Sequence, residues 1–469
     1  MPLPESLAFA TLGDLGRRWR AAEFTAVELA EFFLKRLDTI GRELGAVATL
    51  CRDLALEQAR RADDERRAGR DRGPLHGMPV GVKDLLAVPG YPTTWGCEPY
   101  RERVLEGEAT VVRRLREAGA VLVAKLAMIE LAGGLGYRQA NASWTGPARN
   151  PWKRTTWAGG SSSGSGAAVA AGCVPAAIGS ETWGSILTPA SYCGLTGFRP
   201  TYGLVSRAGA MALSWTMDKI GPMTRTVADA QAVLAVIAGH DPADDSSTAH
   251  GFLPPLETER GPFRIGLLRD PLERVRPDIK TNFDTAVEVL KGFGTVEPVS
   301  LPDFPYSAVA SLIIASEMSA VYDPLVVNGD VWKLTAPEDR PGAHASRLIP
   351  AKDYIHALRI RHKAQKALDA LFAKYDAIVA PATATTAIPI DGEFGSAQVG
   401  FRASGLGAAG NIAGLPCVMV PTGFDDDGLP TSMQLTGRAF ADVRVAAVAG
   451  AYQSKTDWHT KTPPLDTKE

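Results

Sequence analysis

The sequence has few cysteines, and the five that it has do not form a C-x-x-C pair. They are scattered and odd in number, at Cys51, Cys97, Cys173, Cys193 and Cys417. Such usage argues against a disulfide framework or a zinc site and favours a reducing compartment. We therefore expect a cytoplasmic protein.

Long apolar runs and an excess of one charge are missing as well. The longest uncharged apolar run, near 167–179, is broken by Pro175, and residues 1–20 lack the basic and apolar stretches of a signal peptide. Fifty Lys and Arg residues stand against 52 Asp and Glu residues, for a net charge of −2. Because there is no basic footprint and no apolar span, the sequence predicts neither a nucleic-acid partner nor a membrane contact.

Metal and nucleotide motifs are also absent. Seven histidines occur, but there is no H-E-x-x-H or other metal-ligand spacing and no Walker A sequence. His356 and His362 stand at i and i+6 of a predicted helix, a spacing that does not share one face. The sequence thus indicates no metal and no cofactor.

What is present is a chain of 469 residues, 45% hydrophobic and 22% charged, as in a soluble globular protein. Helices are expected at 25–41, where Thr25 and Glu28 have capping-box spacing, and at 51–70. Strands and helices then alternate, with strands at 78–86, 262–270, 295–302, 375–383 and 416–424, a helix followed by a strand at 109–128, and a helix at 277–294. This order predicts an α/β fold with a parallel sheet. Residues 303–370 are expected to be mostly helical, and the looser composition of 240–260 marks a candidate boundary.

The stretch "WAGGSSSGSGAAVAAG" at 157–172 admits several interpretations. With Ser162 at its centre, G-x-S-x-G would match a nucleophile elbow, but the preceding residues form a poor strand and only His459 stands late enough as a partner. A dinucleotide fingerprint would need a third glycine. Two interpretations remain open: a helix N-terminus that presents free N–H groups beside hydroxyls, or a serine-capped helix that packs closely on a sheet.

A second serine-bearing stretch, "GSETWGSILTPASYCG" at 179–194, follows after one helix length and carries Ser185. Lys83 stands at the end of a buried strand, where it could lie beneath both turns. A lysine in such a pocket loses charge stabilisation, so its pKa falls from about 10.4 toward neutrality and it can act as a base. Serine chemistry needs such a base, and no well-placed histidine is available.

These stretches, together with "LHGMPVGVKD" (75–84), "DKIGPMTRTVADA" (218–230) and "NIAGLPCVMVPTGF" (411–424), resemble the amidase signature family of serine hydrolases. The resemblance runs from about residue 20 to 464. It implies a single amidase domain over 1–469, with a signature core at 75–228 and a helical cap or substrate entrance near 303–370. The implied fold is a central mixed, largely parallel sheet with helices on both faces.

The resemblance also implies a Ser-cisSer-Lys triad. Lys83 matches the lysine of the family, Ser161 the bridging serine whose preceding peptide bond is cis, and Ser185 the nucleophile. The backbone N–H groups of the turn before the nucleophile, Thr182, Trp183, Gly184 and Ser185, would form the oxyanion hole. In the implied mechanism Lys83 takes a proton from Ser161 while Ser161 takes one from Ser185, which attacks the carbonyl carbon.

Three positions depart from the family pattern: Glu181 stands where Asp is common, Trp183 where Gly is usual, and Leu187 where Arg is common. Trp183 either packs inside or accommodates bulky or aromatic groups of a substrate. The candidate substrate-pocket residues are Gly133, Gly134, Leu135, Gly136, Trp183 and Leu187.

The family resemblance predicts a hydrolase that cleaves the C–N bonds of anilides and primary amides, or of carbamates, through an acyl-serine intermediate. Aryl acylamidase and urethanase activities are thus both expected possibilities. Its partner would be a small amide or carbamate substrate, and its oligomeric state is not readable from the sequence. The alternative is the glutaminase subunit of a tRNA-dependent amidotransferase, which acts with a partner subunit. Trp183 and Leu187 argue against that alternative, because Gly-Gly-Ser-Ile-Arg is expected there.

Overall fold

The computed structural model describes residues 3–135, 138–253, 261–269, 275–392, 394 and 405–465. The α-helices are α1 Leu12–Arg20, α2 Ala26–Arg36, α3 Arg52–Arg67, α4 Thr110–Glu117, α5 Ser163–Ala170, α6 Leu187–Tyr192, α7 Val227–Ile237, α8 Pro277–Lys291, α9 Tyr306–Val321, α10 Asp323–Val327, α11 Asp339–Ser346, α12 Ala351–Phe372, α13 Leu406–Ala413 and α14 Asp442–Gln453. The strands are β1 Val47–Leu50, β2 Pro79–Lys83, β3 Val121–Leu126, β4 Arg149–Asn150, β5 Lys153–Trp157, β6 Ala176–Glu181, β7 Thr196–Arg199, β8 Lys219–Thr224, β9 Phe263–Leu268, β10 Gly294–Val299, β11 Ala377–Pro381, β12 Cys417–Phe424 and β13 Pro430–Thr436.

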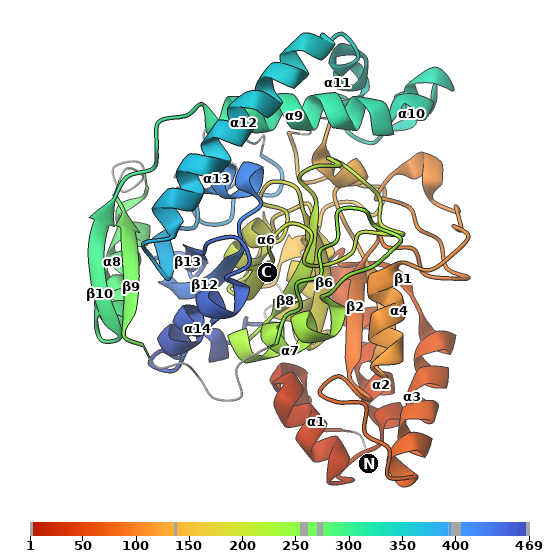
Figure 1. Ribbon diagram of the computed structural model, residues 1–469. Coiled ribbons are helices and arrows are strands. Elements are labelled where there is room, and N and C mark those ends of the chain that lie inside the picture. Colours follow the sequence, from red (N-terminus) through yellow and green to blue (C-terminus); the bar gives the residue numbers. More distant parts are fainter. Residues whose placement is uncertain are drawn as a thin grey trace.

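Within these ranges a central sheet of 11 strands runs through the molecule in the order β1-β3-β2-β6-β8-β7-β12-β13-β11-β9-β10 (Figure 1). Strands β3, β2 and β6 pair in parallel, as do β11, β9 and β10. Between these two groups β8, β7, β12 and β13 pair antiparallel. The predicted α/β class and mixed sheet are confirmed.

The sheet is, however, less parallel than the sequence led us to expect. The reason lies in its centre, where β12 and β13 are joined by the short turn 425–429, a connection that produces antiparallel neighbours. The sequence did not predict β13, nor β1 and β4 to β8. It was wrong about residues 153–157, which were judged a poor strand and form β5. The strands that were predicted are found within a few residues of their expected bounds, and the predicted helix 25–41 becomes α2 followed by a π turn at Leu37–Gly41. The capping box of Thr25 and Glu28 is present.

Helices cover both faces of the sheet. Successive residues of a strand point to opposite faces, and β7 shows what each face meets. The hydroxyl of Thr196 accepts a hydrogen bond from Gln453 of α14 at 2.9 Å, whereas a Cβ on the next residue, Gly197, would lie 2.6 Å from Ala190 of α6. Helices α14 and α6 therefore lie on opposite faces.

The Gly/Ser stretch forms the fully buried helix α5, which packs closely on its surroundings. A Cβ at Gly164 would lie 2.3 Å from the carbonyl oxygen of Ala46, and one at Gly166 would lie 2.9 Å from Pro189. Larger residues would push this helix away from β3 and α6. The close packing that the small residues suggested is therefore present.

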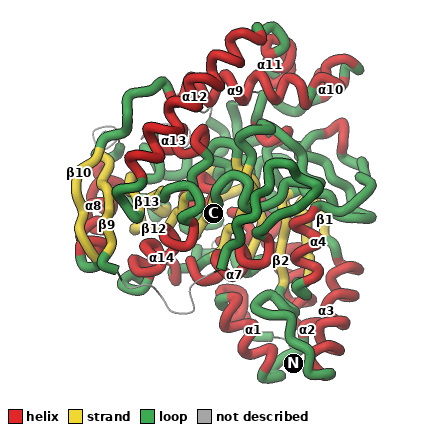
Figure 2. The backbone as a smooth tube through the Cα atoms, viewed as in Figure 1, coloured by secondary structure: helices red, strands yellow, loops and turns green. Residues whose placement is uncertain are grey.

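Residues 306–372 form α9, α10, α11 and α12, which lie together at the top of Figure 1. Figure 2 shows that long loops fill the space between these helices and the ends of β2, β6 and β8. None of the helices in the described ranges has the length and apolar character needed to cross a bilayer.

Candidate active site

Lys83, the last residue of β2, is fully buried at the carboxyl end of the strand. Its Nζ lies 2.8 Å from Oγ of Ser161 and 3.0 Å from Oγ of Ser180. Burial lowers the pKa of Lys83 to about 7, and the more distant carboxylates of Asp218 and Glu181 oppose this fall. At neutral pH a large fraction of Lys83 is consequently an uncharged amine with a lone pair that can accept a proton.

Ser161 lies in the loop between β5 and α5, and the peptide bond from Gly160 to Ser161 is cis. Its side chain is 1% exposed, so Lys83 and Ser161 meet away from water. The carbonyl oxygen of Ser161 accepts a hydrogen bond of 3.1 Å from the N–H of Ile129. A Cβ at Gly160 would lie 2.7 Å from the ring of Trp157, so this loop has little room to move.

Ser185 lies at the end of the turn 182–185, between β6 and α6, and is 8% exposed. Gly184 has φ +92°, a conformation that favours glycine. The carbonyl oxygen of Ser185 accepts from the N–H of Ser162 at 3.2 Å, which joins the two serine-bearing segments. In the described part of the chain, the N–H groups of Gly184 and Ser185 donate to no protein acceptor, and no hydrogen bond joins the hydroxyls of Ser161 and Ser185.

A buried carboxylate holds the far side of this turn. Oε2 of Glu181 accepts hydrogen bonds of 3.0 Å from the N–H groups of Ile186 and Leu187, at the start of α6. Its Oε1 lies 2.9 Å from Arg199 and 3.1 Å from the amide nitrogen of Asn411. Burial raises the pKa of Glu181, but Arg199 and the other partners outweigh burial, and the pKa lies below its usual range. Glu181 is therefore an anion that fixes the chain just after Ser185.

Thr182 and Trp183, the other two predicted oxyanion residues, have different surroundings. The hydroxyl of Thr182 donates to Oδ1 of Asp218 at 2.5 Å, and its carbonyl oxygen accepts from Nζ of Lys219 at 3.3 Å. Trp183 is partly buried and contacts apolar residues of two separate core clusters. The indole thus packs between the sheet core and the cluster beneath α9 and α12.

The candidate pocket residues are spread over different environments. Leu187 is fully buried in the first turn of α6, within the main core. Gly133, the last residue of the short 3-10 turn Glu130–Gly133, and Gly134 are partly exposed, and Leu135 in the loop that follows is buried. A Cβ on Gly134 would lie 2.2 Å from Leu213, so this loop touches the 211–216 loop. Gly136 lies outside the described residues.

Ser162, the centre of the G-x-S-x-G match, and Ser165 of the same stretch make structural contacts. Oγ of Ser162 lies 3.3 Å from both the N–H and the carbonyl oxygen of Ser180. Oγ of Ser165 donates to the carbonyl oxygen of Ile178 at 3.2 Å. Both hydroxyls are committed to β6, and neither contacts Lys83.

A cavity of about 350 Å³ adjoins this centre. Its lining includes the polar residues Ser180, Thr182 and Asp218 and the apolar residues Met211, Leu213 and Trp215. Two of the polar residues, Ser180 and Asp218, were not singled out from the sequence. Ser180 could have been found because it stands two residues before Thr182, near the end of β6, but no sequence signal connects Asp218 to Thr182.

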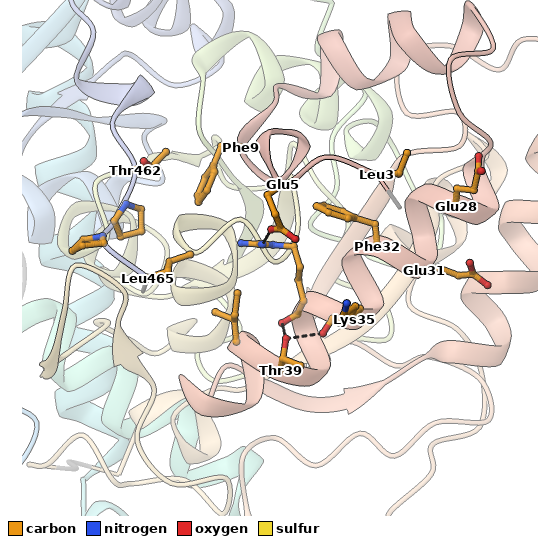
Figure 3. Close-up of a pocket in the computed structure, with 14 residues that line it drawn as sticks. Leu3, Glu5, Phe9, Glu28, Glu31, Phe32, Lys35, Thr39, Thr462 and Leu465 are labelled. Carbon is orange, nitrogen blue, oxygen red and sulfur yellow. Dashed lines mark hydrogen bonds and ion pairs between the residues drawn. The ribbon is translucent and has the colours of Figure 1, made fainter. Parts of the chain in front are cut away.

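A larger cavity, of about 860 Å³, lies between the N-terminal helices and residues 462–465 (Figure 3). Phe9, Phe32 and Glu5 face its centre (Figure 3). Glu5 pairs with Arg36, which also donates to the carbonyl oxygens of Ala171 and Gly172. None of the residues around this cavity belongs to the lysine and serine centre.

Known proteins resemble this chain over nearly its whole length. A family model described as Amidase matches residues 28–446. The A subunit of glutamyl-tRNA(Gln) amidotransferase of Chloroflexus aurantiacus is 38% identical over 95% of this chain and 96% of its own length. The native peptide amidase from Stenotrophomonas maltophilia superimposes with a TM-score of 0.86 at 31% identity, covering 99% of this chain and 100% of that one. The corresponding amidotransferase chain from Thermotoga maritima superimposes with a TM-score of 0.80 at 27% identity, covering 100% of both chains.

These relatives contradict one prediction from the sequence, that the chain has no nucleic-acid partner. The curated relatives are subunits of an enzyme that is named for glutamyl-tRNA(Gln). The prediction was wrong because it used the net charge of this chain alone, and the charge of one protein does not describe the surface of an assembly.

Proposed function

The chain belongs to the amidase signature family, and from this membership we propose that it cleaves the C–N bond of a carboxamide through an acyl-enzyme formed on Ser185. The observation that carries the proposal is the contact between Lys83 and Ser161. The lysine is buried beside hydroxyls, and its pKa of about 7 makes the neutral amine available as a base.

The proposed first step forms the acyl-enzyme. The lone pair of Lys83 accepts the proton of Ser161, Ser161 accepts the proton of Ser185, and Oγ of Ser185 attacks the carbonyl carbon. The N–H groups of Thr182, Trp183, Gly184 and Ser185 stabilise the oxyanion, and one such donor is worth roughly 3 kcal/mol in comparable sites. Ser161 then gives a proton to the leaving nitrogen and regains one from Lys83. The C–N bond breaks and the amine departs.

Water repeats the sequence in the second step. It gives a proton to Ser161, which passes its own proton to Lys83, and the water oxygen attacks the acyl carbon. Ser161 then returns a proton to Oγ of Ser185 and regains one from Lys83. The ester bond to Ser185 breaks and the carboxylic acid leaves. The hydroxyls of Ser161 and Ser185 are not hydrogen-bonded to each other in this structure. We expect a hydrogen bond between them to form when substrate binds.

For the substrate, we propose first a primary carboxamide, with glutamine as the leading candidate. The support is the 38% identity over nearly full length to the glutamyl-tRNA(Gln) amidotransferase chain. In that role the protein would release ammonia from glutamine and act with a tRNA substrate and a partner subunit.

A free-standing amidase that acts on amides, anilides or carbamates is the second candidate. The bulky Trp183 within the turn 182–185 and the buried Leu187 favour it, together with the 31% identity to a peptide amidase. We propose that α9 to α12 cap the entrance in either case. Glu317 of α9 accepts from Ser214 at 2.5 Å and from the N–H of Thr216 at 3.0 Å, which anchors this helix to the loop beside the cavity.

The test is an activity assay of the purified chain with glutamine, simple primary amides, p-nitroanilides and urethanes as substrates. Release of ammonia or amine is measured. Ammonia release from glutamine that rises when a partner subunit is present supports the first candidate, and turnover of the other substrates by the chain alone supports the second. Ser185→Ala should abolish turnover of any substrate that is cleaved. The matched control is Ser165→Ala, which removes a buried hydroxyl that donates to the carbonyl oxygen of Ile178 on β6, and this variant should keep turnover. Undiminished turnover in Ser185→Ala would refute the proposal.

A further inference from the structure

Thr182, the first residue of the oxyanion turn, is held from two sides by two consecutive residues. Its hydroxyl donates to the carboxylate of Asp218, and its carbonyl oxygen accepts from Nζ of Lys219. Asp218 immediately precedes β8, which pairs antiparallel with β6, so that Glu181 lies opposite Lys219. The pairing of these two strands thus places Asp218 beside the turn.

Asp218 is itself fixed by backbone. Its Oδ2 accepts from the N–H of Leu213 at 2.7 Å and from the N–H of Ser214 at 3.1 Å. The side chain is 8% exposed. With the hydroxyl of Thr182, three donors converge on this carboxylate, an arrangement that suits its ionised form. A carboxyl group held in place by backbone therefore sets the position of the Thr182 hydroxyl.

We propose that Asp218 is a positioning residue for amide cleavage: through the hydroxyl of Thr182 it holds the turn 182–185 in the geometry that binds the oxyanion. The inference rests on the proposed function. Glu181 binds the backbone just after Ser185, and Asp218 binds the hydroxyl of Thr182 at the start of the turn. Two buried carboxyl groups therefore fix the two ends of one turn. Displacement of oxyanion donors by an ångström can cost about a hundredfold in rate, which makes such fixing valuable.

The charge of Asp218 has a second effect that a merely structural residue would lack. Asp218 and Glu181 are the carboxylates that raise the pKa of Lys83 against the effect of burial. Burial raises the pKa of Asp218 above its usual range, although the hydrogen bonds from Thr182 and the N–H of Leu213 and the charges of Arg207 and Lys219 lower it in part. Lys83 and Tyr322 also interact electrostatically with this carboxylate. Removal of the negative charge should therefore lower the pKa of Lys83 and move the acidic limb of the rate profile to lower pH.

The chain offers a matched pair for control. Thr201 donates its hydroxyl to Asp442 at 2.5 Å and its N–H at 2.8 Å, and both side chains are buried. This pair reproduces the chemistry of Thr182 and Asp218 at the start of α14, with no contact to the oxyanion turn among the described residues. The same substitutions there measure what loss of a buried threonine–aspartate bond does to the fold alone.

The experiment measures the rate at which a fluorophosphonate probe labels Ser185 in the full chain, by mass spectrometry of the intact protein and its peptides. Labelling needs the nucleophile and the oxyanion turn but no knowledge of the natural substrate. We expect Thr182→Val and Asp218→Asn to label roughly 10- to 100-fold more slowly than wild type. Thr182→Ser, which keeps the hydroxyl, should stay within about threefold, as should Thr201→Val and Asp442→Asn. In Asp218→Asn the acidic limb should also move to lower pH.

The labelling rates distinguish failure of the proposed function from failure of the inference about Asp218. If wild type does not label at Ser185, the proposed function fails and the inference falls with it. If wild type labels and Thr182→Val labels as fast as Thr201→Val, the proposed function stands and the inference is overturned. Should Asp218→Asn fail to fold by thermal melting, Thr182→Val against Thr182→Ser decides alone, because that pair differs at the hydroxyl and leaves Asp218 in place.

Discussion

Two lysines, Lys83 and Lys125, lie fully buried on the adjacent parallel strands β2 and β3. Lys125 pairs with Val82, the residue before Lys83. Lys125 has a carboxylate partner: its Nζ lies 2.7 Å from Oδ1 of Asp84, and it also donates to Oγ1 of Thr93 at 2.6 Å. Lys83 has only the hydroxyls of Ser161 and Ser180, and among the described residues no carboxylate comes within ion-pair distance of it.

The difference shows that burial alone does not make a lysine a base. Burial lowers the pKa of both lysines, but at Lys125 the adjacent carboxylate of Asp84 opposes the fall and favours the charged form. At Lys83 the opposing carboxylates are farther away, and the pKa reaches about 7. Lys125 is thus suited to support the fold and Lys83 to move protons, although the two are neighbours.

The largest expected effect comes from a substitution of Lys83, the proposed base. Lys83→Met removes the base and keeps an unbranched side chain, so we expect kcat to fall by at least about a thousandfold while the far-ultraviolet circular dichroism and the melting temperature are retained. Steady-state kinetics on whichever amide the wild type cleaves provide the readout. Near-normal turnover in this variant would remove Lys83 from the mechanism.

Lys125→Met tests whether the ion pair between Lys125 and Asp84 supports the fold. This change leaves the carboxylate of Asp84 buried without its partner, and we expect a loss of about 3–5 kcal/mol in the free energy of unfolding. Urea denaturation measures it. The double variant Lys125→Met/Asp84→Asn should recover part of the loss, because no charge is then left alone. If Lys125→Met unfolds at the wild-type urea concentration, the ion pair does not support the fold.

The pH dependence sharpens the comparison further. If neutral Lys83 is the base, kcat/KM should fall about tenfold per pH unit below about 7. The free energy of unfolding should rise with pH between about 7 and 10.5, because over that range the unfolded chain binds a proton at this lysine that the folded chain does not. Lys83→Met should lose this rise, and Lys125→Met should keep it. A profile that is flat between pH 5 and 8 would exclude a base with this pKa.

The smallest expected effect comes from Ser180, the second hydroxyl at Lys83. Ser180→Ala removes one hydrogen bond that orients the amine, and a loss of roughly fivefold to tenfold in kcat is expected, about the value of one neutral hydrogen bond. The position of the acidic limb should change little, because no charge is removed. Ser165→Ala is again the matched control. An effect as large as that of Lys83→Met would show that Ser180 takes part in the proton transfer itself.

Much of this comparison could be predicted from the sequence. The apolar run that ends in Lys83 indicated a buried strand. In the serine-bearing stretches around α5, the family resemblance implied Ser161 as the bridging serine and Ser185 as the nucleophile. For the Gly/Ser stretch the sequence left two interpretations open. The structure shows the close packing of one of them, at Gly164 and Gly166, but among the described residues no serine side chain caps α5.

What could not be predicted depends on contacts between distant segments. Asp218 meets Thr182 only because β6 and β8 pair antiparallel, and the sequence suggested a largely parallel sheet. β13 escaped notice because its buried residues include polar ones such as Gln434, whose amide donates to the carbonyl oxygen of Pro381 on the neighbouring strand. The prediction that the chain has no nucleic-acid partner was wrong, because it used only the net charge of this chain.

The most direct test of the central claim is nuclear magnetic resonance of the full chain with lysines labelled at Cε and Nζ. Lys83→Met and Lys125→Met assign the two buried amines. The account predicts that the Lys83 amine titrates near pH 7 and that Lys125 stays protonated to higher pH. A Lys83 amine that remains charged through pH 9 would contradict it.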